Sequence, residues 1–325
     1  MSKLPLRARL AATIGRAAGQ VSRLAGRGDG SVIGGVIALR VEPGLLAMLA
    51  AGRQVVLVTG TNGKTTTTRL ITAALESVGQ VASNAFGANM EAGLTTALGQ
   101  ARDAPFAVLE VDEKYLPSVL TATAARAVAL LNLSRDQMDR AAEIWLVARR
   151  WRDALADAPD CRVIANADDP LIAWAAAAAK QVTWVAAGQR WREDSWCCPV
   201  CGSHLVRSES DWRCGECGFA KPAASWVLDG QVVLDPAGRR HELGLALPGR
   251  ANRANAVVAL AVAETFGIGA ELALARLRTV TSVAGRYTTV LRRGGTSGYC
   301  WRRTRPAGWR RSTCSSPRRG RCCSR

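Results

Sequence analysis

The sequence lacks the two features that would direct it across a membrane. It has no uninterrupted apolar run of about 18 residues, so no membrane-spanning helix is predicted. Its N-terminal stretch is broken by Arg7, Arg9, Arg16 and Arg23, so it has no apolar core of the kind that an export signal needs. The ten cysteines are therefore expected to be reduced thiols in the cytoplasm. Contact with the inner face of the cell membrane is left open.

Acidic residues are absent from one part of the chain. The formal net charge is +17, but residues 286–325 contain twelve arginines and no Asp or Glu, so residues 1–285 carry only +5. A strongly basic chain normally indicates nucleic acid or an anionic membrane as its partner, yet this body is only mildly basic. With 325 residues, 48% of them apolar, the chain is expected to fold around a proper core rather than stay disordered.

The segment QVVLVTGTNGKTTTT, residues 54–68, has the pattern of a phosphate-binding loop. It predicts a buried strand at 55–58, a tight glycine loop and a helix at 66–75. Lys64 would neutralise phosphate oxygens and Thr65 would ligate Mg²⁺. The spacing is shorter than in the common P-loop, and a chance glycine turn is the alternative. The predicted nucleotide contacts are Gly60, Thr61, Asn62, Gly63, Lys64, Thr65 and Thr66.

Predicted strands and helices alternate after this loop. The strands are expected at 106–111, 127–133, 162–165 and 181–186, with helices such as 139–155 and 171–179 between them. This alternation predicts an α/β fold with a doubly wound, largely parallel sheet. Functional residues should then gather at the carboxyl ends of the strands, where Gly60, Glu110, Asn132 and Asn166 fall.

Glu110 is the acid expected to complete the Mg²⁺ shell opposite Thr65. Capping of the following helix is a role that suits Asp112 or Glu113 better. Lys64 and Glu110 are therefore the predicted catalytic residues.

A cysteine-rich insertion is expected at residues 190–222. Two C-x-x-C pairs, each followed by glycine, predict a closed and therefore structural zinc ribbon. Cys197 is an adjacent spare and His204 a weaker candidate ligand. Use of the ribbon for nucleic-acid binding is the competing interpretation, although basic and aromatic residues are sparse here. The predicted Zn²⁺ ligands are Cys198, Cys201, Cys214 and Cys217.

Residues 1–26 predict a basic amphipathic helix. Its apolar residues recur every three or four positions, at Leu6, Leu10, Ile14, Ala17, Val21 and Leu24, and Arg9, Arg16 and Arg23 fall on another face. Packing of this helix on the domain that follows is favoured over a position on a membrane surface.

GTNGKTT resembles the phosphate loop of the Mur ligase superfamily, whose members couple ATP to amide formation through an acyl phosphate. LEVDE around Glu110 and NLSRDQMD at 132–139 also resemble superfamily segments, but Gln137 replaces the metal-binding histidine. NADDP at 166–170 and GRANRAN at 249–255 resemble segments that line the nucleotide base and ribose, with helix capping as the alternative. The resemblance implies ATP and Mg²⁺ as cofactors, and nucleotide contacts at Asn166, Asn252 and Asn255, the last two spaced to face one ligand.

The four-cysteine insertion narrows the resemblance to the branch that forms the ligase subunit of lipid II isoglutaminyl synthases. This implies ATP-dependent amidation of the D-glutamate α-carboxylate of lipid II to D-isoglutamine, in peptidoglycan synthesis. The implied partner is a glutaminase subunit, GatD, which supplies ammonia within a heterodimer. Two alternatives stay open: another carboxylate–amine ligase of the superfamily, and a zinc-ribbon protein that binds nucleic acid.

After residue 290 the sequence stops resembling a globular protein, and its Arg, Ser, Cys and Trp show no periodicity. Reading the codons of residues 299–301 in another frame restores a segment similar to the start of the family's C-terminal domain. We therefore expect a helical or linker segment at 1–50, the ATP-binding domain at 51–285, and an out-of-frame, disordered remnant at 286–325. Such a chain is expected to bind Zn²⁺, and ATP weakly, but not to amidate lipid II.

Overall fold

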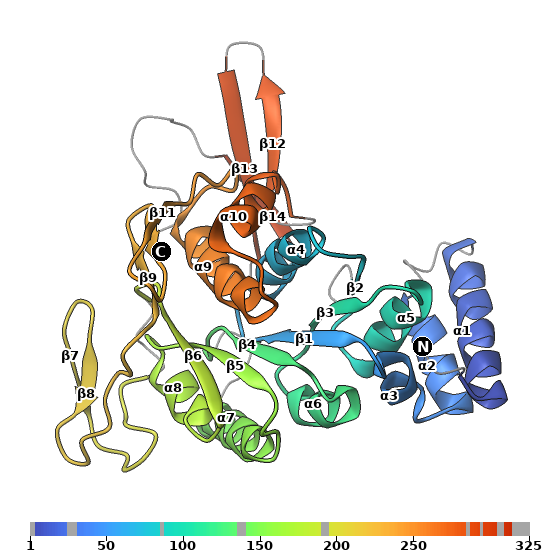
Figure 1. The fold of residues 1–325 in the computed structure, drawn as a ribbon, viewed down its shortest axis with the longest axis horizontal. Coiled ribbons are helices and arrows are strands. Elements are labelled where there is room, and N and C mark those ends of the chain that lie inside the picture. The colour runs from blue at the N-terminus through green and yellow to red at the C-terminus, as the bar shows by residue number, and fades with distance from the viewer. Residues whose placement is uncertain are drawn as a thin grey trace.

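The structure is a computed structural model that describes residues 4–24, 31–84, 88–134, 141–189 and 195–283, and the backbone of 287–292, 295–303 and 309–313. One large sheet organises the chain (Figure 1). Its strands are β1 (Gln54–Thr59), β2 (Val81–Ser83), β3 (Phe106–Glu110), β4 (Ala127–Leu130), β5 (Arg162–Asn166), β6 (Gln181–Ala186), β9 (Trp226–Asp229), β10 (Val232–Leu234) and β11 (Arg240–Glu242). They are ordered β11-β10-β9-β6-β5-β4-β1-β3-β2.

Pairing is parallel from β2 through to β9. The pairings of β10 with β9 and with β11 are antiparallel. The α/β fold with a largely parallel sheet is therefore confirmed. In β1, Val55 and Leu57 pack into one apolar layer and Val56 and Val58 into the other. A strand that is buried on both faces needs a continuous apolar run, and residues 55–58 therefore do not alternate between apolar and polar side chains.

Helices cover both faces of the sheet (Figure 1). They are α1 (Leu6–Leu24), α2 (Ser31–Val41), α3 (Leu45–Ala50), α4 (Lys64–Leu75), α5 (Glu91–Gln100), α6 (Leu116–Thr123), α7 (Ala141–Ala156), α8 (Pro170–Ala176), α9 (Arg250–Thr265) and α10 (Ala270–Arg278). Helices α4, α9 and α10 lie on one face and α3, α5, α6, α7 and α8 on the other. None of the described helices combines the length and hydropathy of a bilayer span.

The N-terminal helix α1 packs on the domain, as expected, but through the opposite face from the one that its periodicity suggested. It buries Ala8, Ala11, Ala12, Gly15, Gly19 and Ser22. A Cβ atom on Gly15 would meet the Gly34 carbonyl oxygen of α2 at 2.6 Å, so the two backbones approach too closely for larger side chains. The apolar row Leu6, Leu10, Ile14, Ala17, Val21 and Leu24 is left exposed.

The cysteine-rich insertion carries the short hairpin β7 (Leu205–Arg207) and β8 (Trp212–Cys214). In the tail, the backbone forms strands β12 (Tyr287–Arg292), β13 (Gly295–Arg303) and β14 (Trp309–Thr313), which pair antiparallel in that order. The proposed domain limits and the out-of-frame origin of the tail remain predictions.

Candidate functional site

The loop at 60–63 connects β1 to α4 at the point where the strand order reverses, since β3 lies on one side of β1 and β4 on the other. Gly60 and Gly63 have φ angles of +139° and +89°. A Cβ atom on Gly60 would lie 2.9 Å from the Asn132 backbone nitrogen, and one on Gly63 would lie 2.8 Å from Oδ1 of Asn255. Both positions therefore favour glycine for their conformation, and the backbone atoms beside Gly60 also leave no room there for a Cβ atom.

Asn132, two residues beyond β4, clamps this loop. The Thr61 N–H donates to the Asn132 carbonyl oxygen at 2.9 Å, and the Asn62 N–H donates to Oδ1 of Asn132 at the same distance. Nδ2 of Asn132 returns a 2.9 Å hydrogen bond to the carbonyl oxygen of Asn62. Ser134 adds a backbone N–H donated to Oγ1 of Thr61 at 2.9 Å. The end of the neighbouring strand thus fixes the loop before any ligand arrives.

Helix α4 begins at Lys64, directly after this loop, and has no acidic residue in its first turn. The N-terminal N–H groups of α4 and their partial positive charge therefore face the loop, and no acidic side chain of the first turn neutralises them. This arrangement favours binding of an anion such as a phosphate. Thr65 is half-buried, while Thr66 is buried beneath the loop.

Lys64 is held by two oxygen atoms. Its Nζ donates to the carbonyl oxygen of Gly60 at 2.6 Å and to Oε1 of Glu113 at 3.0 Å. Glu113 is itself positioned by Trp151, whose indole nitrogen donates to the Glu113 carbonyl oxygen at 2.8 Å. Of the two acids that suited a capping role, only Asp112 accepts a turn N–H, from Lys114. The pairing of Glu113 with Lys64 had no signal in the sequence.

Glu110 ends β3 and pairs in register with Val58 of β1, so it lies at the same sheet edge as the loop. It is buried, and Asn84 holds its backbone from both sides with two 2.8 Å hydrogen bonds. The carboxyl ends of four parallel strands thus bring Gly60, Glu110, Asn132 and Asn166 to one edge, as expected. Shared Mg²⁺ ligation by Thr65 and Glu110 remains a prediction.

A cavity of about 340 Å³ opens beside the loop, between the ends of β4, β5 and β6 and the start of α9. Asn255 lines it next to Gly63, and Asn166 lines it with its Nδ2 donating to the Leu131 carbonyl oxygen at 2.8 Å. Asn252 is not among the lining residues, because its Nδ2 turns back to the Pro248 carbonyl oxygen at 2.6 Å. The i, i+3 spacing therefore does not bring both amides to one ligand.

Two carboxylates of the NADDP segment hold the surroundings of the cavity, and the first of them, Asp168, lines it. One oxygen of Asp168 accepts the N–H groups of Ala187, Gly188 and Gln189, and its other oxygen pairs with Lys221 Nζ at 2.7 Å.

Asp169 accepts the Leu133 N–H at 3.0 Å and caps α8. Burial raises the pKa of Asp169, although its hydrogen bonds from backbone N–H groups oppose this. Both acids therefore serve mainly to hold the loops that surround the cavity.

The four predicted zinc ligands come together. Their Sγ atoms lie within 4.8 Å of one another, with Cys198 to Cys217 at 3.6 Å and Cys201 to Cys214 at 3.5 Å. A tetrahedral zinc site with Zn–S bonds of about 2.3 Å would separate its thiolates by about 3.8 Å, so this donor set fits Zn²⁺. Hydrogen bonds from Ser203 lower the pKa of Cys201 to about 6, whereas burial raises the pKa of Cys198.

The ribbon packs against the domain through Trp212. Trp212 is buried, and its indole nitrogen donates to the Ala167 carbonyl oxygen at 3.1 Å. Phe219 packs on Trp212 with ring centroids 5.1 Å apart. Cys197 lies outside the four-cysteine cluster and bridges by its backbone to His204.

Comparison with known proteins agrees with this geometry. The Mur ligase middle domain family matches residues 58–263. The chain is 30% identical over 306 residues to the lipid II isoglutaminyl synthase (glutamine-hydrolyzing) subunit MurT of Streptococcus pneumoniae (strain ATCC BAA-255 / R6), covering 86% of this chain and 68% of that protein. The MurT subunit of Staphylococcus aureus (strain COL) is 28% identical over 295 residues, covering 84% and 66%. The chain thus spans about two thirds of the length of these relatives.

Solved structures give the same fold. A pseudomurein peptide ligase type C from Methanothermus fervidus superposes with a TM-score of 0.60 at 19% sequence identity, covering 76% of this chain and 53% of that one. At this identity, the likeness concerns the fold alone.

Proposed function

Because this chain belongs to the Mur ligase family and is a relative of the MurT subunits, we propose that residues 51–285 bind Mg²⁺-ATP and activate a carboxylate for amide formation. The observation that carries the proposal is the loop itself. Two glycines with positive φ, a helix N-terminus and a largely buried lysine meet there beside a 340 Å³ cavity. These are the groups that bind the phosphates of a nucleotide.

In this proposal the loop N–H groups and Lys64 hold the β- and γ-phosphates, and Thr65 and Glu110 ligate Mg²⁺. The cavity beside Asn166 and Asn255 takes the base and ribose. A phosphate oxygen that reaches Nζ of Lys64 competes with Glu113 for it, so ATP binding moves the lysine from one anion to the other. Asn252 acts indirectly, by holding the turn before α9.

The finer reaction that we propose follows the relatives' name. A carboxylate oxygen of the D-glutamate residue of lipid II attacks the γ-phosphorus of ATP, and ADP leaves. Ammonia then attacks the acyl carbon of the resulting acyl phosphate, and inorganic phosphate leaves. The ammonia comes from a glutaminase subunit, GatD, and the reaction takes place in the cytoplasm. Since the chain spans about two thirds of its relatives, the full reaction is proposed for the assembled enzyme.

Zn²⁺ has a structural role in this proposal. Four thiolates fill a tetrahedral shell and leave no open position for a substrate or water. Lys221, at the end of the ribbon, contacts Asp168 in the cavity wall, so the metal supports the nucleotide site without touching the nucleotide.

Titration calorimetry of the full chain with Mg²⁺-ATP tests the proposal. We expect one site per chain, and Lys64→Ala should weaken it at least tenfold. Lys180→Ala, which removes an exposed lysine that follows α8, is the matched control and should bind normally. Absence of nucleotide binding by a folded chain would overturn the proposal. Ammonia-dependent amidation of lipid II separately tests the finer reaction, and it is measured with the glutaminase subunit and a chain whose reading frame after residue 290 has been restored.

A further inference from the structure

The outer side of α1 is an unusual surface. Its large apolar side chains point away from the protein, with Leu6 81%, Leu10 58% and Leu24 90% exposed. With Ile14, Ala17 and Val21 they form a row within about 80° around the helix, on the side opposite the packed small residues. We call this set the apolar row. Helix α1 lies at one end of the molecule (Figure 1). The large side chains of the apolar row are exposed there.

Arginines flank the apolar row. Arg9, Arg16 and Arg23 follow one another at seven-residue intervals along one flank, and Arg7 lies on the other. Helix α1 contains no Asp or Glu. The Arg7 Nε is occupied by the carbonyl oxygen of Val41 at 2.9 Å. Arg7 Nε also lies 3.5 Å from Oε2 of Glu42, so this arginine already has an acidic partner. The flank formed by Arg9, Arg16 and Arg23 carries charge of one sign, which an anionic surface complements.

Further unsatisfied donors lie behind this flank. In the described part of the chain, Nε and one terminal nitrogen of the Arg102 guanidinium are buried without a hydrogen-bond partner. Burial lowers the pKa of Arg102, and the charges of Arg16 and Arg9 lower it further, against the effect of Asp103. The guanidinium of Arg102 adds positive charge behind the arginine flank, which an anionic surface complements.

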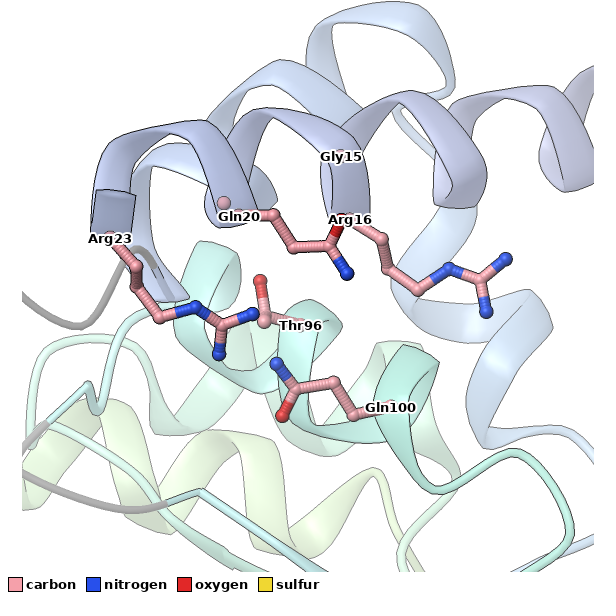
Figure 2. A pocket seen from close by; sticks show the side chains of 7 residues that line it. Gly15, Arg16, Gln20, Arg23, Thr96 and Gln100 are labelled. Carbon is pink, nitrogen blue, oxygen red and sulfur yellow. The ribbon is translucent and has the colours of Figure 1, made fainter. Parts of the chain in front are cut away.

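A cavity of about 200 Å³ lies between α1 and α5 on the same flank. Figure 2 shows Gln20 and Arg23 of α1 extending toward Thr96 and Gln100 of α5, with Arg16 further along the helix. The guanidinium groups of Arg16 and Arg23, which line this cavity, suit a phosphate-bearing headgroup.

We propose that α1 lies flat on an anionic phospholipid bilayer, with the apolar row in the acyl boundary and Arg9, Arg16 and Arg23 among the lipid phosphates. A helix with a large apolar face and flanking arginines binds membranes in this way. A second copy of the chain is a poorer occupant, because pairing of two apolar rows sets arginine flank against arginine flank. The proposal goes beyond the ligase reaction and does not depend on it.

Flotation of the full chain with vesicles tests this proposal. We expect binding to vesicles that contain 30% phosphatidylglycerol and little binding to pure phosphatidylcholine. Leu10→Asp with Val21→Asp should reduce binding at least tenfold. Arg9→Gln, Arg16→Gln and Arg23→Gln together should reduce it about 100-fold. Leu272→Asp, on a side chain of α10 that is also about half exposed, is the matched control and should bind normally.

The basic tail must be separated from α1 in this test. Deletion of residues 291–325 should leave a vesicle affinity that still depends on the apolar row. Loss of binding on this deletion, with no effect of the α1 substitutions, would overturn the proposal. So would equal binding to neutral and anionic vesicles, or no binding at all. Each variant must keep its Mg²⁺-ATP affinity and melting temperature, which distinguishes failure of the docking surface from failure of the nucleotide site.

Discussion

Lys64 Nζ and Oε1 of Glu113 lie 3.0 Å apart, and both side chains are largely buried. The lysine that is expected to meet a phosphate is thus already paired with a carboxylate. Glu113→Gln removes this partner, so we predict a free energy of unfolding lower by about 1–2 kcal/mol without nucleotide. The increase in melting temperature on adding Mg²⁺-ATP should be larger than in the wild type, since phosphate then provides the missing anion. Glu143→Gln, at an exposed position in α7, is the control.

A smaller shift in Glu113→Gln than in the wild type would show that Glu113 assists nucleotide binding rather than competing with it. Differential scanning fluorimetry with and without Mg²⁺-ATP measures both quantities.

Substitutions at Gly63 and Gly52 distinguish the effect of backbone strain from the effect of a steric contact. Both have positive φ, +89° and +77°, but only Gly63 faces another group, Oδ1 of Asn255. Alanine at either position should cost about 1–2 kcal/mol of stability through strain. We predict that Gly63→Ala also weakens Mg²⁺-ATP binding by tenfold or more, whereas Gly52→Ala leaves it unchanged. Calorimetry gives the affinities, and equal affinities in the two variants would contradict the assigned nucleotide contact.

Removal of zinc should affect the nucleotide site at a distance. We predict one Zn²⁺ per chain, its loss in Cys214→Ser, and normal content in Cys197→Ser. Because Lys221 pairs with Asp168 in the cavity wall, the zinc-free protein should bind Mg²⁺-ATP several-fold more weakly. Metal analysis and titration after treatment with a chelator measure this. An unchanged affinity in the fully zinc-free chain is the contrary result.

The stability of the chain should depend on pH through His241. Hydrogen bonds to Asp235 at 3.0 Å and to Glu271 at 2.8 Å raise the pKa of His241 above its ordinary value of 6.5, although burial acts to lower it. A raised pKa stabilises the folded state fully below pH 6.5, and the contribution is lost as pH rises through the folded value. We predict that wild type loses stability between pH 6 and 9 relative to His241→Gln.

His204→Gln alters the other, exposed histidine and should follow the wild type. At the acid end, burial tends to raise the pKa of Asp235, but hydrogen bonds from His241 and Arg239 hold it at about 2. Its stabilisation is therefore present above about pH 3.8 and lost as pH falls toward 2. Thermal melts from pH 2 to 9 test both statements.

The tail supports a prediction at the level of the gene. We expect resequencing around codons 288–300 to find a change of reading frame. An intact frame there would contradict the out-of-frame origin of the tail. We also predict that the present chain, mixed with glutaminase and lipid II, gives no amidation. Turnover equal to that of a full-length relative would contradict this prediction.

The loop and the sheet could be predicted because their signals are local. A β-branched run followed by two glycines and Lys-Thr specifies a strand, a loop and a helix within fifteen residues, and the alternation of strands and helices predicts a largely parallel sheet. The strand order was not predicted and comes from the structure. Predicted ends were less accurate: β4 stops at Leu130 rather than 133, because Leu131 and Asn132 turn to bind β1 and the loop.

Contacts between distant elements gave no such signal. The sequence indicated neither the pairing of Glu113 with Lys64 nor the N–H groups gathered by Asp168, because the partners lie about 20 to 50 residues apart. Spacing alone treated Asn252 and Asn255 as equivalent, whereas the turn at Pro248 uses one of them. In α1 the hydropathy pattern pointed to the wrong packed face, since a row of alanine and glycine packs closely while carrying little hydropathy.

The carboxylate of Asp168 has a consequence for engineering. It joins three backbone amides of the segment after β6 to an ammonium from the end of the ribbon. Deletion of the ribbon, to make a minimal ligase, would therefore leave the buried carboxylate of Asp168 without its cationic partner. A viable deletion must retain Lys221 or neutralise its acidic partner.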